Sequence, residues 1–143
     1  ENTGDRKCVF CDYELKDRII KESENTLTIL SDPYLLKGHC LVIPKKHFES
    51  ILEVPEEVLF ELVKEVRAVE RFLIEKFKIS GCDIRQHYRP FQKQSNLKVN
   101  HLHFHVIPRE FEDELYEKSM IFEKDVFKKL DENTVNQFRE VLG

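Results

Sequence analysis

Short apolar runs separated by polar turns recur along the chain, and they are typical of strands. The predicted strands cover residues 18–21, 27–30, 40–44, 82–86 and 99–107. Ser31-Asp32-Pro33 and Gly38 mark turns between the second and the third of them. The third run, Cys-Leu-Val-Ile-Pro, is apolar throughout, which predicts a strand buried on both faces.

One long helix is predicted between the third and fourth strands. Pro55 suits the first helical position, and the acids Glu56 and Glu57 favour the positive end of the helix dipole. Apolar residues then recur at helical spacing as far as Gly81: Leu59, Leu62, Val63, Val66, Val69, Leu73 and Phe77. A shorter amphipathic helix is predicted over 134–142. Because no regular alternation of strands and helices appears, the pattern predicts an α+β fold with an antiparallel sheet.

Composition limits the class of protein. With 143 residues, 41% hydrophobic and 35% charged, the chain suits one soluble globular domain. No apolar run approaches the roughly 18 residues of a membrane span, so no membrane partner is expected. Four unevenly placed cysteines are too few for a secreted disulfide framework, which favours a reducing, cytoplasmic setting. A net charge of −4 does not favour nucleic acid as a partner.

The charge is unevenly distributed. Residues 84–109 contain no acid. The basic residues within this range are Arg85, Arg89, Lys93, Lys98 and Arg109. Such a stretch suits an anionic ligand, although a solvated basic loop would have the same composition.

Three histidines in this range form the most informative pattern of the sequence. Residues 100–108 read Asn-His-Leu-His-Phe-His-Val-Ile-Pro, so His101, His103 and His105 alternate with apolar residues. Successive side chains of an extended strand point to opposite faces, and the three imidazoles therefore share one face. Packing alone gives no reason for three polar rings in a row. We interpret the segment as part of an active site rather than as a solvated strand face.

Cysteine supplies a second group of candidate ligands. Cys8 and Cys11 form a Cys-x2-Cys half-site for zinc, and a free, reduced pair of thiols is the alternative. His47 and His101 could complete a closed, tetrahedral structural site. The three strand histidines cannot share one ion, because positions four residues apart on a strand lie about 13 Å apart. At least one imidazole is therefore left for other chemistry.

A histidine without a metal can act as a nucleophile or as a proton shuttle. His103 is best placed, since it has a histidine on each side. Phosphorus is the natural target, because a loose phosphoryl transition state needs mainly positioning and positive surroundings. His105 could hydrogen-bond the same phosphate oxygens, and Arg109 lies just beyond.

The segment 101–107, with Pro108-Arg109 behind it, resembles the His-φ-His-φ-His-φ-φ signature of the histidine triad (HIT) family of nucleotide hydrolases and transferases. Residues 38–47, Gly-His-Cys-Leu-Val-Ile-Pro-Lys-Lys-His, are similar to the second block of that family, and Cys8-x2-Cys11 resembles the motif of its zinc-bearing members. The resemblance implies one HIT-like domain over 1–143, with a core at about 8–109 and a divergent extension at 110–143. It also implies a five-stranded antiparallel sheet with one long helix, usually paired into a homodimer.

The resemblance further implies roles for single residues. His103 would form a covalent nucleotidyl-histidine with an α-phosphate, and His105 and His39 would complete the catalytic group by orienting and hydrogen-bonding. Structural zinc would be held by Cys8, Cys11, His47 and His101. The residues implied to bind the nucleotide are Ile29, Leu30, Ser31, Asp32, Arg89, Gln94, Ser95 and Arg109.

The chain departs from the family pattern around the phosphate. Members carry an acid or amide for the ribose hydroxyls eight positions before the histidine of the Gly-His pair, where this chain has Ser31 followed by Asp32. Their glycine-containing loop before the triad is replaced by a longer loop without glycine. The basic residues expected to bind phosphate there, or to recognise a more anionic leaving group, are Arg89, Lys93 and Lys98.

The leading hypothesis is an enzyme that acts through His103 on nucleoside 5′-phosphates joined to a leaving group, as in phosphoanhydrides, phosphoramidates or adenylylated adducts. A phosphorylase or nucleotidylyltransferase would use the same residues, with phosphate or a nucleotide in place of water. A zinc-stabilised nucleotide-binding module with little activity is the third alternative. The expected partner in every case is a nucleotide or dinucleotide.

Overall fold

The computed structural model describes residues 8–11, 13–93 and 99–143. Its strands are β1 (Ile19–Glu22), β2 (Thr26–Leu30), β3 (Cys40–Pro44), β4 (Gly81–Arg85) and β5 (Phe104–Arg109). Its α-helices are α1 (Glu56–Phe77) and α2 (Glu132–Leu142). Short 3-10 turns cover Val9–Cys11, Tyr13–Asp17, Ile51–Glu53 and Glu123–Asp125, and a π-helical turn covers Tyr116–Met120.

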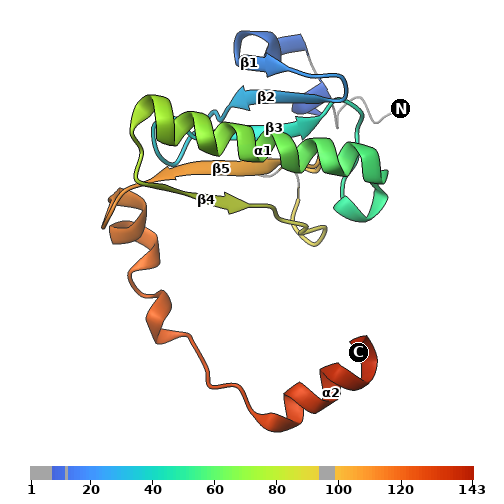
Figure 1. Ribbon diagram of the computed structural model, residues 1–143, viewed down its shortest axis with the longest axis vertical. Coiled ribbons are helices and arrows are strands. Elements are labelled where there is room, and N and C mark those ends of the chain that lie inside the picture. Colours follow the sequence, from blue (N-terminus) through green and yellow to red (C-terminus); the bar gives the residue numbers. More distant parts are fainter. Residues whose placement is uncertain (1–7, 12, 94–98) are drawn as a thin grey trace. The chain divides into compact units, whose positions relative to one another are not determined.

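The five strands form one sheet in the order β1-β2-β3-β5-β4, and every neighbouring pair is antiparallel. β3 lies in the centre, and all five of its residues are buried, as the apolar run predicts. Helix α1 crosses one face of this sheet (Figure 1). The predicted α+β class with a five-stranded antiparallel sheet is confirmed.

Helix α1 builds the first of two apolar cores. Its buried side chains Leu62, Val66, Val69 and Leu73 pack against Cys40, Val42, Leu102 and Val106. The helix starts one residue later than predicted, because Pro55 is its N-cap with an extended backbone at φ −59° and ψ 148°. It ends at Phe77 rather than near Gly81, since Lys78 turns into the left-handed region at φ 58°.

The opposite face of the sheet carries the second core. Phe10 and Leu15, from the N-terminal turns, pack there against Ile29, Leu41 and Ile43. The N-terminal segment therefore covers the half of the sheet that contains β2 and β3. This arrangement brings Phe10 and the Cys-x2-Cys motif to the face that carries the histidines.

The histidine segment is a strand only in part, which corrects the predicted strand at 99–107. β5 begins at Phe104, where its ladder with β3 also ends. Before that point the chain binds the segment that follows β3: the Leu102 N–H donates to the Phe48 carbonyl (2.6 Å) and His101 Nε2 to the Pro44 carbonyl (2.8 Å). The alternation nevertheless holds, because Leu102, Phe104 and Val106 all face the α1 core.

The chain forms two compact units, which divide between Phe111 and Glu112. The second unit holds α2, whose N-cap Asp131 accepts the Thr134 N–H at 2.7 Å, so the helix begins two residues before the predicted range. That both units belong to one domain stays a prediction. Among the described residues, no helix combines the length and the apolar character needed to cross a bilayer.

Candidate active site

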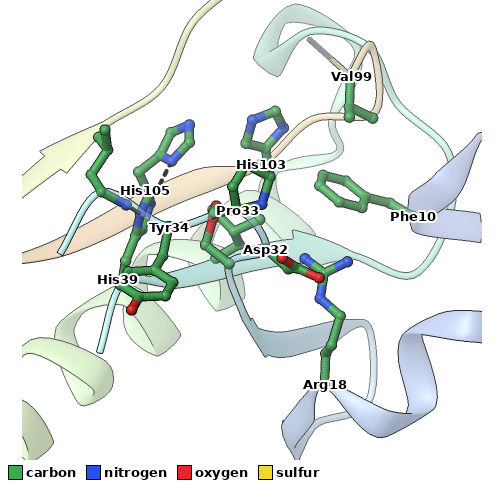
Figure 2. A pocket seen from close by; sticks show the side chains of 12 residues that line it. Phe10, Arg18, Asp32, Pro33, Tyr34, His39, Val99, His103 and His105 are labelled. Atoms are coloured by element: carbon green, nitrogen blue, oxygen red, sulfur yellow. Dashed lines mark hydrogen bonds between the residues drawn. The ribbon is translucent and has the colours of Figure 1, made fainter. Parts of the chain in front are cut away.

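Two histidines from neighbouring parts of the sheet are hydrogen-bonded to each other. His39, directly before β3, lies with its Nε2 at 2.9 Å from Nδ1 of His105 in β5 (Figure 2). His39 Nδ1 accepts the backbone N–H of Leu35 at 3.1 Å. Because a backbone N–H can only donate, the proton of a neutral His39 sits on Nε2, which donates to His105. His105 in turn carries its proton on Nε2.

Both of these imidazoles are neutral at neutral pH. Burial, followed by the charges of Arg85 and His103, lowers the pKa of His39 to about 4. Burial, followed by the charges of His103 and His39, lowers the pKa of His105 to about 3. The pair therefore presents one N–H donor, at His105 Nε2, rather than a positive charge.

His103 lies beside this pair with its tautomer also fixed. Its Nδ1 is 2.8 Å from the carbonyl oxygen of His101, which can only accept, so Nδ1 carries the proton and the lone pair lies on Nε2. The ring centroids of His103 and His105 are 4.8 Å apart. Figure 2 shows Phe10 on the other side of His103, where its ring stands edge-on at 5.2 Å.

A pocket of about 610 Å³ opens over this group on the face opposite to α1. It is lined by Phe10, Arg18, Ser31, Asp32, Pro33, Tyr34, Leu35, His39, Leu41, Val99, His103 and His105. The structure thus brings the predicted residues Ser31, Asp32, His39, His103 and His105 to one pocket. The Ser31 hydroxyl donates to the Pro33 carbonyl (2.6 Å), while the Asp32 carboxylate is exposed.

Other residues predicted to bind the nucleotide lie elsewhere. Ile29 is buried in the second core, and Leu30 is exposed with its carbonyl bound by Arg18 at 3.0 Å. Arg109, at the far end of β5, donates to Asp83 at 2.6 Å. Arg89 lines a second pocket, described below. Gln94 and Ser95, together with Lys98, lie outside the described residues.

Two further residues near the histidines are absent from the predicted set. Arg85, the last residue of β4, pairs directly with His105 across the sheet. The ring of His87 lies 5.5 Å from that of His105, centroid to centroid. Arg85 and His87 are two residues apart, so in an extended strand their side chains share one face, as those of the alternating histidines do. This spacing is the signal by which the sequence could have indicated them.

The predicted metal ligands also form one cluster. One ligand atom from each of Cys8, Cys11, His47 and His101 lies within 4.8 Å of every other. The Sγ atoms of Cys8 and Cys11 lie 3.4 Å from His101 Nδ1, and Cys11 Sγ lies 3.5 Å from His47 Nδ1. Tetrahedral bonds of about 2.3 Å to sulfur and about 2.0 Å to nitrogen put such atoms about 3.5 Å apart. The cluster therefore has the dimensions of a zinc site.

The surroundings of the cluster suit a cation. The Pro44 carbonyl accepts from His101 Nε2, and Glu49 lies 3.4 Å from His47 Nε2, so both Nδ1 atoms turn their lone pairs to the thiols. Burial, followed by the neighbouring Cys11, raises the pKa of the Cys8 thiol to about 12. A bound cation would offset this effect by stabilising the thiolates.

Comparisons with known proteins agree with this arrangement. Residues 12–112 match the HIT domain, and the chain belongs to the HIT family. An uncharacterized HIT-like protein of Methanocaldococcus jannaschii is 34% identical over 105 residues, which cover 71% of this chain and 78% of that protein.

Two further relatives carry chemical information. A crystal structure of a zinc-bound histidine triad family protein from Mycobacterium smegmatis superposes with a TM-score of 0.63 at 32% identity, covering 77% of this chain and 80% of that chain. The adenosine 5′-monophosphoramidase HNT1 of Saccharomyces cerevisiae is 26% identical over 110 residues, which cover 75% of this chain and 65% of that protein. The HIT family thus includes enzymes that hydrolyse nucleotide derivatives.

Proposed function

We propose that this protein hydrolyses or transfers nucleoside 5′-monophosphates from phosphoanhydrides, phosphoramidates or adenylylated adducts, through a covalent intermediate on His103. The observation that carries the proposal is the hydrogen bond of 2.8 Å from His103 Nδ1 to the His101 carbonyl. It leaves the lone pair on Nε2 of a side chain that lines the large pocket. The phosphoramidase activity named for the yeast relative supports the same class of reaction.

The pocket has room for a nucleoside, since its volume of about 610 Å³ lies within the usual range for small-molecule sites. Phe10, Leu41 and Val99 supply apolar contacts for a base. The Asp32 carboxylate is the acceptor we assign to the ribose hydroxyls, because the Ser31 hydroxyl is already bonded to Pro33. The α-phosphate would then lie against His103 and His105.

In the first step, Nε2 of His103 attacks the α-phosphorus, the nitrogen–phosphorus bond forms, and the bond to the leaving group breaks. The leaving group takes the electron pair of that bond. The Nε2–H of His105 donates to a phosphate oxygen or to the departing atom. The Nε2–H of His39 donates to His105 Nδ1 and so keeps the proton of His105 on Nε2.

In the second step, water attacks phosphorus, the nitrogen–phosphorus bond breaks, and the electron pair returns to His103. The nucleoside monophosphate leaves, and the water proton restores the N–H of His105 where that proton went to the leaving group, or passes to solvent where the leaving group departed as an anion. Inorganic phosphate or a second nucleotide in place of water would make the same residues a phosphorylase or a nucleotidylyltransferase. Product analysis with and without added phosphate separates these reactions.

We further propose that Cys8, Cys11, His47 and His101 bind structural zinc, which would hold the N-terminal segment against the histidine segment. The sulfur–nitrogen distances of 3.4–3.5 Å support this role, as does the zinc-bound relative. Because zinc ligation requires reduced thiols, the cluster suits a reducing compartment such as the cytoplasm. A homodimer also belongs to this proposal, and sedimentation velocity would measure it.

The test of the proposal is substitution of the nucleophile. We expect His103→Ala to reduce turnover of adenosine 5′-monophosphoramidate by at least about three orders of magnitude. The free energy of unfolding should change by no more than about 1 kcal/mol, because His103 is only half-buried. Intact-mass spectrometry after rapid acid quench should detect an adenylyl adduct in the wild type and none in the variant.

An unchanged rate in His103→Ala would contradict the proposal and favour a binding module. Glu75→Gln, an exposed change on α1, which covers the opposite face of the sheet, serves as the control and should form the adduct.

A further inference from the structure

A row of cationic and polar side chains runs beside the histidines on β4 and its continuation. The ladder between β4 and β5 ends where Arg85 pairs with His105. Two residues further on, the His87 ring lies 5.5 Å from the His105 ring, with the two planes tilted by 50°. On the face of the sheet that carries the histidines, Arg85 and then His87 therefore lie beside His105.

This row approaches His105 from the side opposite to His39. β5 lies between β3 and β4 in the sheet, His39 directly precedes β3, and His87 follows β4. His39 has a fixed role, because it holds the His105 tautomer. His87 is exposed and lies outside that hydrogen-bonded chain. It thus extends the site beyond the large pocket, away from the region assigned to the nucleoside.

A small pocket of about 100 Å³ marks where the extension leads. It is lined by Glu49, His87, Tyr88, Arg89, Pro90, Val99, Asn100, His101 and Leu102. Val99 lines both pockets, so the two adjoin. One acid, Glu49, belongs to the lining, and it lies 3.4 Å from His47.

The charge around this row is positive. Arg85 and Arg109 both bind the carboxylate of Asp83, at 3.3 and 2.6 Å. Arg89 adds a further guanidinium at the small pocket. Partial burial of its ring, followed by the charges of Arg89, His103 and Arg85, lowers the pKa of His87, so these groups act on one another. Its neutral imidazole still offers one N–H donor.

Leaving groups differ in what they require. An amine leaving from a phosphoramidate must gain a proton, which the N–H of His105 can supply. A sulfate or phosphate leaving from an anhydride departs as an anion and needs positive charge and hydrogen-bond donors around its oxygens. The row beside β5 offers those groups on the side of His105 that faces away from His39.

We propose that Arg85, His87 and Arg89 form a subsite for an anionic leaving group and select nucleoside phosphoanhydrides over phosphoramidates. This inference rests on the proposed function, because it requires turnover at His103. The planar guanidinium group suits sulfate or phosphate, because its two parallel N–H donors bind two oxygens of the anion.

The experiment compares two substrates with the same nucleotide and small leaving groups of different charge, adenosine 5′-phosphosulfate and adenosine 5′-monophosphoramidate. The quantity measured is the kcat/KM for the phosphosulfate divided by the kcat/KM for the phosphoramidate. Arg89→Gln and His87→Gln should each lower this ratio about tenfold, since a hydrogen bond to a charged group has about that effect. Arg89→Lys keeps the charge but not the two parallel N–H donors, so it should lower the ratio less than Arg89→Gln does.

Arg71→Gln is the matched control, because Arg71 is an exposed arginine on α1, which covers the opposite face of the sheet. Its ratio should equal that of the wild type, and thermal unfolding should be the same for all variants. A ratio that Arg89→Gln and His87→Gln leave unchanged would overturn the inference. So would a wild type that forms the adduct from the phosphoramidate but not from the phosphosulfate. Failure to form it from either compound would remove the proposed function as well.

Discussion

At the level of single residues, backbone groups decide which nitrogen of each histidine carries the proton. The Leu35 N–H fixes His39, and the His101 carbonyl fixes His103. The neutral form of each imidazole therefore has one defined donor and one defined acceptor. This arrangement separates the roles, since His103 presents a lone pair and His105 presents a proton.

The lowered pKa of His39, about 4 against an ordinary 6.5, predicts acid sensitivity of the fold. Between these two values the unfolded chain binds a proton that the native state does not, so stability falls as the pH falls from about 6.5 to 4. His39 contributes at most about 3 kcal/mol to this loss. Urea unfolding of the wild type and of His39→Asn across this range measures the effect.

Asparagine keeps an acceptor for the Leu35 N–H but does not titrate, so the stability of His39→Asn should depend less steeply on pH. Contributions from the Cys/His cluster cancel when the two slopes are compared. Equal slopes would show that His39 is protonated in the native state at its ordinary pKa.

At the level of elements, Glu61 fixes the position of α1 on the sheet. Its carboxylate accepts the backbone N–H of Asn25 (2.9 Å), the side-chain amide of Asn25 (3.1 Å) and the Thr26 hydroxyl (2.9 Å). Although burial raises the pKa of Glu61, these hydrogen bonds lower it overall. One helical turn further on, Glu65 binds Lys21 at 2.7 Å. The helix thus holds both the turn between β1 and β2 and β1 itself.

We expect Glu61→Gln to destabilise the protein by about 1–2 kcal/mol, because an amide retains only one acceptor for three donors. Glu75→Gln, an exposed change on the same helix, should shift stability by less than about 0.5 kcal/mol. Urea unfolding at neutral pH measures both variants. An equal, small effect of the two changes would show that Glu61 does not hold the turn.

Local patterns predict the elements well where one strong feature decides them. The apolar run Cys40–Pro44 and the helical stripe of α1 both appear where the sequence places them. The start of β5 could not be predicted, because it depends on bonds from His101 and Leu102 to residues far away in the chain. The pocket wall formed by Phe10 and Tyr34 also depends on contacts between distant parts of the chain, so no local pattern predicts it. The position of His87, by contrast, follows from alternation along a strand.

At the level of the whole molecule, the Cys/His cluster joins segments that are far apart in the sequence. Cys8 and Cys11 come from the N-terminal segment, whereas His101 lies two residues before His103, the proposed nucleophile. Loss of a metal here would release the N-terminal segment, and with it Phe10, from the histidine face.

We therefore expect Cys8→Ala to lower the free energy of unfolding by more than about 3 kcal/mol. Cys82→Ala, at a half-buried cysteine outside the cluster, should have a much smaller effect. Thermal unfolding and zinc content measure the difference. During titration with a chelator, turnover should fall together with the folded fraction, because the proposed metal has a structural role. If activity disappears while the fold persists, the metal acts in the reaction itself.

The two compact units predict the effect of shortening the chain. The sheet, α1, the Cys/His cluster and every residue of the large pocket lie before Glu112, and the match to the HIT domain also ends at residue 112. In the second unit Phe122, Phe127, Leu130 and Phe138 are exposed, and no residue of α2 is buried. A chain that ends at Phe111 should keep adduct formation at His103 within about threefold and its melting temperature within a few degrees. Adduct mass spectrometry and thermal unfolding test this expectation, and a loss of adduct formation in a folded, shortened chain would assign the second unit to the substrate site.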